Sequence, residues 1–512
     1  MYAPVRNESD PMLASPTSGG KEQRATPNSV AVHTQRLDAR APQCNDGVFA
    51  ALFLINVGLV AVVALSKGVP VLLEDMDHNQ ETAPNEEAPR ATAAWSMIGL
   101  LCVLGLGLSA AWLKVLLTYA ESMIRVALWL NVATVLLVAL SLVSVHLWAA
   151  LVCVALAAIN VWYIYAVQNR IGFASANLKT ACAALQRHAA VFVLALGLVL
   201  QQLVWLFLWG VAGVGLHQWF REMDPECDQE LRRARSGRSH GGLCVGLPAY
   251  TALFYMLVTV YWGQQVLQNI LTCTTAGVVA TWWYQPEAAR ATTGALYRSM
   301  TTSFGSICFG SLIVAVLQAL RTMADMAKRR ASEENNGGLA CLACMAECIL
   351  SCLAGVMEYI NQWAYVYVGV YGYPFRASGK AVMDLFHTRG WTAIINDDLT
   401  SGALSFGALG VGVVTCCVGM LMVRFSPVEW FAALGSSTSA YAMMAVVGFI
   451  VGISVAMTLA HVVIAALHTV FVCFAEDPVA LNRNHPEEYQ GLVAGWRQFH
   501  GSALVSAYGG AV

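Results

Sequence analysis

The side chains best placed to do chemistry lie in residues 241–286, a charge-free stretch that is long enough to cross a bilayer as a helix. Eight polar or aromatic side chains gather at its centre: Tyr261, Trp262, Gln264, Gln265, Asn269, Thr272, Thr274 and Thr275. Helical spacing places six residues on one face: Trp262, Gln265, Asn269, Thr272, Ala276 and Trp283. Polar groups inside a bilayer need protein, water or a solute as partners. The stripe therefore predicts either a solute path or a helix interface bonded through Gln and Asn, and both interpretations carry equal weight.

Other reactive patterns in the sequence are weak. Four cysteines recur at helical spacing within residues 338–373: Cys341, Cys344, Cys348 and Cys352. A Cys-x-x-Cys pair suggests zinc, but a zinc site needs a second pair or histidines at matching spacing, and none follows. We therefore expect no metal and no other cofactor, and we interpret the cysteines as a stripe at the membrane face that is open to acylation. No expected span contains an HExxH motif, a GxSxG motif or a pair of catalytic aspartates, so the sequence does not indicate an enzyme.

The composition is that of a polytopic membrane protein. Hydrophobic residues make up 57% and charged residues 12% of the 512, against roughly 45–50% and about 25% in soluble domains. The 29 basic and 31 acidic side chains give a formal net charge of −2, so no overall field favours a nucleic acid partner. We expect an all-α polytopic integral membrane protein with about ten transmembrane helices in the lipid bilayer.

Hydropathy divides the chain into three parts. Residues 1–45 are rich in Pro, Ser, Thr and charge and predict a disordered cytosolic tail. The first apolar run begins near Gly47, which is too deep for a cleavable secretory signal. Residues 46–475 form the expected transmembrane domain, and residues 476–512 a cytosolic C-terminal tail. The expected spans lie within residues 47–66, 92–113, 126–145, 146–169, 189–216, 241–286, 299–320, 338–373, 399–423 and 441–475.

Charge in the loops predicts the orientation. Residues 170–188 carry basic side chains and no acid, which places them in the cytosol. Alternation then puts residues 217–246 outside, where Cys227 and Cys244 form the candidate disulfide, with two free thiols as the alternative. A basic cluster in residues 321–330 looks cytosolic, although alternation places it outside. Either residues 241–286 turn within the membrane, or residues 338–373 are not an ordinary span.

Four blocks in the second half of the chain form a distinctive set. They are TAGVVATWWY at 275–284, TTSFGSICFGSLI at 301–313, NQWAYVYVGVYGYPFRASGKAVMD at 361–384, and TVFVCFAED at 469–477 followed by NHP at 484–486. In this order they resemble the choline transporter-like family, solute carrier family 44. The layout is closer to the fungal and plant-type members, because the first external loop is short. The resemblance covers residues 250–490 well, whereas residues 1–240 match only in hydropathy.

The resemblance implies ten spans, cytosolic termini and transport of choline or a related small organic cation such as ethanolamine. Transport would proceed by facilitated diffusion or proton-coupled exchange, with alternating access to a site in the membrane. The plasma membrane is the implied location, with an endomembrane as the alternative. A non-transporting membrane scaffold or lipid-binding protein is the competing interpretation. The oligomeric state stays open.

A quaternary ammonium group has no hydrogen-bond donor, so aromatic faces and a carboxylate are the expected partners. The candidate binding residues are Trp262, Gln265, Asn269, Tyr261, Trp282, Trp283, Tyr365, Tyr367 and Glu358. Each has a structural alternative: an interfacial belt for Trp282 and Trp283, ordinary packing for the tyrosines, and solvation of a helix end for Glu358. His461 and His468 share a helical face and are candidates for proton coupling, although hydrogen bonding between helices is the favoured interpretation.

Overall fold

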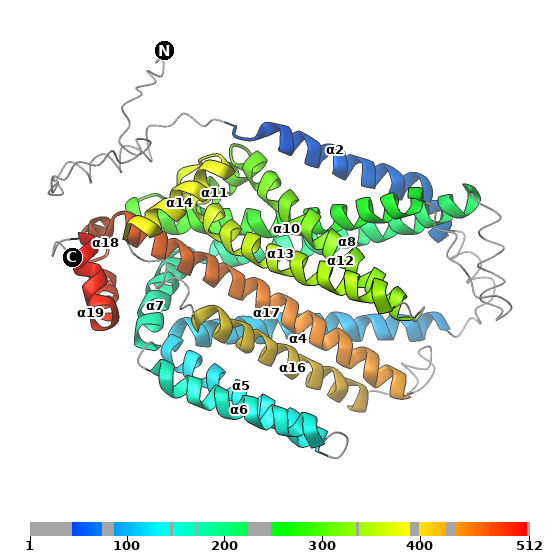
Figure 1. Cartoon of the computed structure of the whole chain (residues 1–512), viewed down its shortest axis with the longest axis horizontal. Helices are drawn as coiled ribbons and strands as arrows, with labels where there is room; N and C mark the ends of the chain where they lie inside the picture. Colours follow the sequence, from blue (N-terminus) through cyan, green and yellow to red (C-terminus); the bar gives the residue numbers. More distant parts are fainter. Residues whose placement is uncertain are drawn as a thin grey trace, which may run out of the picture. The chain divides into compact units, whose positions relative to one another are not determined.

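The computed structural model describes residues 44–73, 87–143, 147–168, 171–223, 247–333, 337–389, 399–425 and 437–508. The chain divides into two units, Met1–Ala41 and Pro42–Val512, and the first unit lies outside the described residues. Every regular element within the described ranges is a helix (Figure 1). The expected all-α fold is therefore confirmed. Cys227 and Cys244, the candidate disulfide, lie outside the described residues.

Among the described residues, ten long helices lie at the positions of the expected spans. They are α2 (Gly47–Val63), α4 (Glu87–Thr118), α5 (Ala120–Leu142), α6 (Leu147–Val167), α8 (Ala190–Met223), α10 (Leu247–Tyr284), α12 (Phe304–Glu333), α13 (Gly337–Tyr371), α16 (Leu399–Phe425) and α17 (Ser437–Glu476). A π-helical segment, η1 (Ala64–Gly68), follows α2. In the described part of the chain, seven helices are long and apolar enough to cross a membrane, or up to eight if the bent pair α6–α7 is one span. The 38-residue α10 is not among the seven, because its central Gln, Asn, Thr and aromatic side chains lower its hydropathy.

Five further helices complete the described structure: α7 (Ile171–Arg187), α11 (Ala291–Met300), α14 (Phe375–Arg389), α18 (Pro478–Asn484) and α19 (Pro486–Tyr508). The basic segment expected as a loop at 170–188 is mostly the helix α7, which buries one side against its neighbours. The segment 476–512 holds α18 and α19. Asp477 begins α18, because its Oδ1 accepts hydrogen bonds from Val479 N at 3.0 Å and Ala480 N at 3.1 Å. Pro478 at the first helical position fits the same start.

The long helices fall into two groups of five that meet along α17. One group contains α2, α8, α10, α12 and α13, and the other contains α4, α5, α6, α16 and α17. The principal contacts between the groups are those of α17 with α10, α8 and α13. Figure 1 shows α17 running between the two sets. A path lined by both groups would therefore follow α17.

The sequence offered two explanations for the basic cluster at 321–330, a turn within residues 241–286 or an irregular span at 338–373. The structure supports neither of them. Both α10 and α13 are unbroken helices, and α13 is among the seven that are long and apolar enough to cross a membrane. The cluster lies in the last turns of α12, where Lys328, Arg329 and Arg330 have partners. Lys328 Nζ lies 2.7 Å from Oε2 of Glu347, and Arg330 Nη1 donates to the Tyr250 hydroxyl at 2.9 Å.

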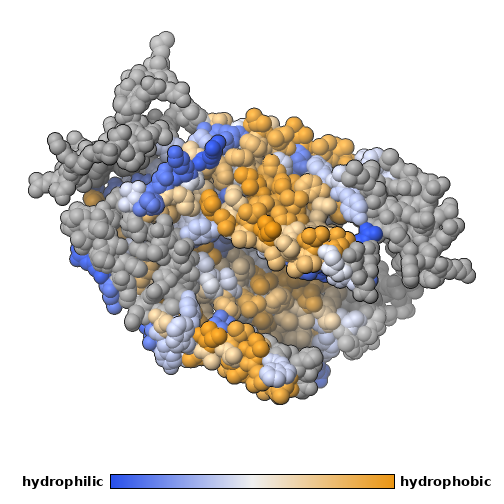
Figure 2. Space-filling model, viewed as in Figure 1, coloured by the Kyte–Doolittle hydropathy of each residue, from blue (hydrophilic) through white to orange (hydrophobic). Residues whose placement is uncertain are grey.

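Apolar side chains cover much of the outer surface. Figure 2 shows two apolar bands with a recess between them. Large apolar side chains on the α5–α6 hairpin and α8 stand exposed, such as Trp148 at 83% and Phe207 at 72%. Exposed apolar surface of this extent is what a lipid environment covers. The four cysteines of the 338–373 stripe are also exposed on α13, as expected for a stripe at the membrane face.

Candidate functional site

The helix α10 lies at the centre of its group and contacts α8, α12, α13 and α17. At 1.5 Å per residue its 38 residues extend over about 57 Å. Small residues bring it close to α13: a Cβ atom at Gly369 would collide with the carbonyl oxygen of Cys273. The two backbones are therefore in direct contact, and the polar stripe of α10 meets neighbouring helices at short range.

The two central aromatics of α10 are held by α12 and α2. Trp262 is 6% exposed, and its Nε1 donates to the carbonyl oxygen of Cys308 at 2.9 Å. The ring packs edge-on against Phe53, with centroids 5.2 Å apart. Tyr261 is half-buried, and its hydroxyl lies 2.9 Å from Oγ1 of Thr322.

A buried polar chain links α10, α12 and α13. Asn269 Nδ2 donates to Ser311 Oγ at 3.0 Å. The Ser311 hydroxyl lies 3.2 Å from that of Tyr365, which also donates to the Ile307 carbonyl at 3.3 Å. This part of the stripe bonds helices together, as the interface interpretation predicted. Gln265, the neighbouring residue on the stripe, is half-buried.

His461 of α17 bonds to α10 across the boundary between the groups. Its Nε2 lies 2.8 Å from Thr272 Oγ1, and its Nδ1 lies 3.4 Å from Gln268 Nε2. Thr272 Oγ1 donates in turn to the Gln268 carbonyl at 3.2 Å. Because the amide nitrogen of Gln268 can only donate, the set fits a neutral imidazole with its proton on Nε2. His461 thus holds α17 to α10 through Thr272 and Gln268, and of these two partners the Thr272 hydroxyl can act as donor or as acceptor.

His468 lies seven residues further along α17, on the same side, and faces α13. Its ring packs against that of Trp363 at a tilt of 42°, with centroids 4.3 Å apart, and Trp363 meets Phe386 edge-on at 5.0 Å. His468 and Trp363 are 5% and 2% exposed. The shared face expected for the two histidines is therefore present, and it points toward the other helix group.

Three tyrosines and a carboxylate meet where α13 and α17 end. The Tyr367 hydroxyl donates to Oε1 of Glu476 at 2.6 Å. Its ring lies 4.6 Å from that of Tyr371 and 6.0 Å from that of Tyr373. The buried hydroxyls of Tyr284 and Tyr371 make no hydrogen bond of ordinary geometry within the described residues. We call Tyr367, Tyr371, Tyr373 and Glu476 the tyrosine–glutamate cluster; it combines aromatic faces with one anionic group.

Sequence reasoning missed Glu476, because the residue falls in the segment assigned to the C-terminal tail. A signal was present: Glu476 directly ends the charge-free run from Ser437 to Ala475. Tyr371 and Tyr373 lie within the block at 361–384, but neither is among the candidate binding residues. Glu476, Tyr371 and Tyr373 lie close together because the ends of α13 and α17 are near each other.

Trp282 and Trp283 anchor the end of α10 to the C-terminal segment. They are 3% and 0% exposed, so the interfacial-belt alternative is wrong. Trp283 Nε1 donates to the Asp477 carbonyl at 3.0 Å, and its own carbonyl accepts from Asn484 Nδ2 at 2.8 Å. The Trp282 ring stacks at 4.0 Å on His485. The tryptophan block and the Asn-His-Pro block therefore pack against each other.

The structure does not bring Glu358 to Tyr365. Glu358 is exposed on α13, and its Oε1 accepts from Gln318 Nε2 at 3.0 Å. Tyr365 is 1% exposed and bonds to α12. Among the described residues, the carboxylate that contacts the aromatic end of α13 is Glu476.

Comparison with known proteins shows which family this chain resembles in sequence. Residues 151–479 match the family model described as "Plasma-membrane choline transporter". Protein PNS1 of Mycosarcoma maydis is 28% identical over 468 residues, covering 88% of this chain and 82% of the relative. Protein PNS1 of Eremothecium gossypii is 24% identical, covering 88% and 80%. A CTL-like protein of Dictyostelium discoideum is 25% identical over 459 residues, covering 88% and 75%.

These alignments extend well into the first half of the chain, so the expectation that residues 1–240 match only in hydropathy is wrong. The four sequence blocks and the packing of α10 against α12, α13 and α17 both fall largely within the matched region 151–479. The chain belongs to the choline transporter-like family, a family of multi-pass membrane transporters.

Proposed function

We propose that this protein carries choline, or a related small organic cation such as ethanolamine, across a membrane by facilitated diffusion or proton-coupled exchange. Membership of a family whose model is named for choline transport supports the substrate class. The same name supports the plasma membrane as its location, with an endomembrane as the alternative.

The tyrosine–glutamate cluster is the observation that carries the proposal. A quaternary ammonium group is attracted to the faces of aromatic rings, by about 0.5–2 kcal/mol per ring depending on desolvation. Tyr367, Tyr371 and Tyr373 place three rings within 6.0 Å of one another. Glu476 adds a carboxylate bonded to the first of them. Rings and carboxylate come from the ends of α13 and α17, which belong to different helix groups.

The location of the cluster suggests how transport would occur. The rings now pack on one another, so a bound cation would have to separate them. A shift of α17 relative to α10 and α13 would open that space, and the reverse shift would close it. Such a movement of one helix group against the other is the usual basis of alternating access. Trp262, Gln265, Asn269, Tyr261 and Tyr365 lie further along the same group and form the proposed continuation of the path.

We propose that the end carrying α7, α18 and α19 faces the cytosol. Lys179 and Arg187 on α7 support this orientation through the positive-inside rule. His461 and His468 are the proposed groups for proton exchange, because imidazole is the side chain whose unperturbed pKa lies closest to physiological pH. Both lie on α17 at the boundary that would move.

Uptake of radiolabelled choline into vesicles holding the purified protein tests the proposal. Glu476→Gln removes the anionic group of the cluster, and Glu358→Gln removes an exposed carboxylate on α13 as the matched control. We expect Glu476→Gln to raise the half-saturating choline concentration about tenfold, because a charged partner is lost, and Glu358→Gln to leave it unchanged. Repeating uptake with an imposed pH gradient separates facilitated diffusion from proton exchange. If wild-type vesicles take up no more choline or ethanolamine than protein-free vesicles, the scaffold or lipid-binding interpretation replaces this one.

A further inference from the structure

Asn45, which lies just before α2, bonds to two connections between helices that are distant in the sequence. Its backbone N donates to the carbonyl oxygen of Thr302, between α11 and α12, at 3.2 Å. Its side-chain Nδ2 donates to the carbonyl oxygen of Gly372 at 2.7 Å. Gly372 belongs to residues 372–374, which join α13 to α14 and which we call the α13–α14 corner. Asn45 therefore ties this corner to the start of α12.

Asp46 adds two hydrogen bonds to the same neighbours. Its Oδ2 accepts from Ser306 Oγ on α12 at 2.7 Å and from the backbone N of Phe375, the first residue of α14, at 3.1 Å. Within the described ranges, Asp46 is the one non-glycine residue with a positive φ, at 55°. Such a conformation persists where the surrounding structure fixes it, and it is found often at functional sites. We call Asn45 and Asp46 the latch.

The latch lies directly against the backbone of α12. A Cβ atom at Gly305 would collide with the carbonyl oxygens of Asn45 and Asp46. The first turn of α2 packs on the same helix, because the Phe49 ring stacks on that of Phe309 with centroids 4.3 Å apart. The starts of α2 and α12 therefore form one support for the α13–α14 corner.

The ring of Phe375 fixes the corner on its α14 side. A Cβ atom at Gly310 on α12 would collide with this ring. The ring also lies 5.6 Å from that of Phe309 and 5.3 Å from that of Tyr365. On the α13 side, Gly372 has a φ of 68°, the left-handed conformation in which helices commonly end. The latch and the Phe375 ring together determine the path of the chain from α13 to α14.

The same corner carries two rings of the tyrosine–glutamate cluster. Tyr371 is the last residue of α13 and Tyr373 lies in the corner, one on each side of Gly372. The Tyr373 ring is nearly parallel to that of Tyr367, with an interplanar angle of 16° and centroids 6.0 Å apart. Because the latch bonds to the Gly372 carbonyl, the directions of both neighbouring side chains depend on it.

We propose that Asn45 and Asp46 are positioning residues for the cation site, because they hold the α13–α14 corner so that the rings of Tyr371 and Tyr373 stay in the tyrosine–glutamate cluster. This inference rests on the proposed function and deepens it, since neither residue of the latch belongs to the cluster. A corner that leaves its place removes two rings from the site. The apparent affinity for choline then falls with the fraction of molecules in the competent arrangement.

Two substitutions of Asp46 separate its acceptor oxygen from its backbone conformation. Asp46→Gly keeps the positive φ, which glycine adopts without steric cost, and removes the acceptor. The Phe375 amide should then exchange its hydrogen faster, and the half-saturating choline concentration should rise about two- to tenfold, as expected for loss of ordinary hydrogen bonds. Asp46→Asn keeps an acceptor oxygen and tolerates the same conformation, so both values should stay close to wild type.

Asn45→Asp tests the bond to Gly372. A carboxylate has nearly the shape of the amide but cannot donate to the Gly372 carbonyl, so this variant should behave like Asp46→Gly. Exchange is measured by mass spectrometry on peptic fragments that cover residues 370–380 of the full chain, and uptake is measured in vesicles. The maximal uptake rate should change less than the half-saturating concentration. Fragments of α16 should exchange as in wild type, which distinguishes a loosened corner from general unfolding.

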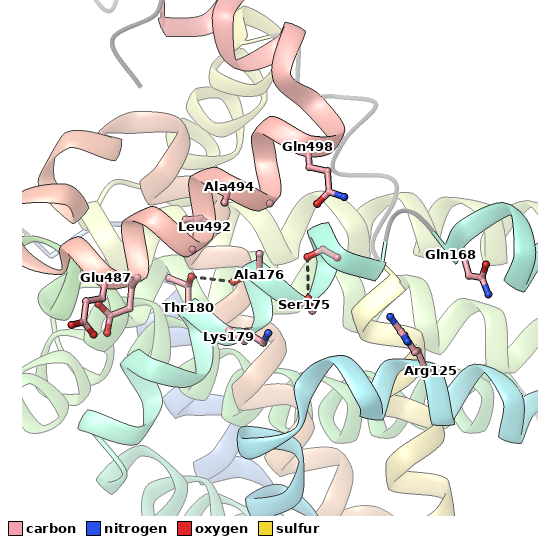
Figure 3. Close-up of a pocket in the computed structure, with 14 residues that line it drawn as sticks. Arg125, Gln168, Ser175, Ala176, Lys179, Thr180, Glu487, Leu492, Ala494 and Gln498 are labelled. Atoms are coloured by element: carbon pink, nitrogen blue, oxygen red, sulfur yellow. Dashed lines mark hydrogen bonds between the residues drawn. The ribbon is translucent and has the colours of Figure 1, made fainter.

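Two matched controls alter the same chemical groups away from the latch. Asp384→Ala removes an exposed carboxylate of α14 itself. Gln498→Glu converts an exposed amide of α19 into a carboxylate, as Asn45→Asp does at the latch. Gln498 lines a polar pocket of about 730 Å³ between α5, α7 and α19, to which the latch contributes no residue (Figure 3). Both controls should match wild type in exchange and in half-saturating concentration.

Three results would overturn the assignment. Values for Asp46→Gly equal to those of wild type would mean that the latch does not hold the corner. An equal loss in Asp46→Asn and Asp46→Gly would show that the acceptor bonds are not responsible. Faster exchange with an unchanged half-saturating concentration would make the latch a structural contact alone. Absence of choline and ethanolamine uptake in wild type is a different failure: it refutes the transport proposal, and the role of the latch in cation binding with it, whatever the exchange of the corner.

Discussion

The Tyr367 hydroxyl donates a 2.6 Å hydrogen bond to Oε1 of Glu476 and so joins the end of α13 to the end of α17. These helices belong to the two groups of five that meet along α17. Any movement of one group against the other must change this bond, the His461 contacts with α10, or the packing of the His468 ring against Trp363. The polar contacts at the boundary are therefore the first place to test function.

Substitutions of Tyr367 should distinguish the contribution of its aromatic ring to choline binding from that of its hydroxyl. Tyr367→Phe keeps the aromatic face and loses the bond to Glu476, so the half-saturating choline concentration should rise only slightly. Tyr367→Leu loses the face as well and should raise it about five- to thirtyfold. Tyr297→Leu, at a position 69% exposed on α11, is the control for general effects of losing a tyrosine. Equal values in all four proteins would remove Tyr367 from the binding site.

Trp262 remains a predicted binding residue, and its packing makes a stability measurement necessary. Both Trp262→Phe and Trp262→Leu lose the bond to Cys308, worth about 1 kcal/mol, and both should lower the thermal midpoint of the purified protein. If the indole also attracts the cation, the half-saturating concentration should rise in the order wild type, Phe, Leu, with Leu about five- to thirtyfold above wild type. A lowered midpoint with an unchanged half-saturating concentration would show that Trp262 serves packing alone.

Hydropathy predicted most of the long helices because their apolar runs are long enough to be recognised by themselves, whereas α10 was recognised from its lack of charged residues. The role of Trp282 and Trp283 was harder to predict, since their burial depends on α18, about 200 residues further along the chain. Glu476 was placed in a tail for the same reason: nothing local reveals that Tyr367 meets it. Residues 171–187 were expected as a loop because basic residues marked a cytosolic segment, and charge alone does not distinguish a loop from an amphipathic helix.

His468 should modulate transport rather than be required for it. His468→Phe keeps a ring that can pack against Trp363 but cannot carry a proton, so most choline uptake should remain while any dependence on a pH gradient weakens. His468→Ala removes the ring too, and we expect a lower thermal midpoint from the cavity left beside Trp363. Complete loss of uptake in the Phe variant, with normal stability and membrane level, would make His468 essential and refute this prediction.

The orientation can be tested with introduced cysteines in intact cells. In a background whose exposed native cysteines are replaced by Ser, Lys179→Cys on α7 should resist an impermeant thiol reagent. Glu333→Cys, at the end of α12 opposite α18 and α19, should react. Arg235→Cys, which lies outside the described residues, should also react if residues 217–246 are external. Labelling of Lys179→Cys without labelling of the other two would reverse the proposed orientation.

The close approach of α10 and α13 predicts a large difference between two glycines of the same helix. A Cβ atom at Gly369 would collide with the backbone oxygen of Cys273, whereas one at Gly355 would meet nothing within 4 Å. Gly369→Ala must push the helices apart, at a cost of about 1–3 kcal/mol typical of overpacking, and should lower the thermal midpoint and the yield of folded protein. Gly355→Ala should be neutral or slightly stabilising, because Ala favours a helix by about 1 kcal/mol over Gly. The midpoints of the two purified variants in the same detergent decide the matter. If both match wild type, α10 and α13 are not in backbone contact, and the arrangement that brings Tyr367 to Glu476 would need revision.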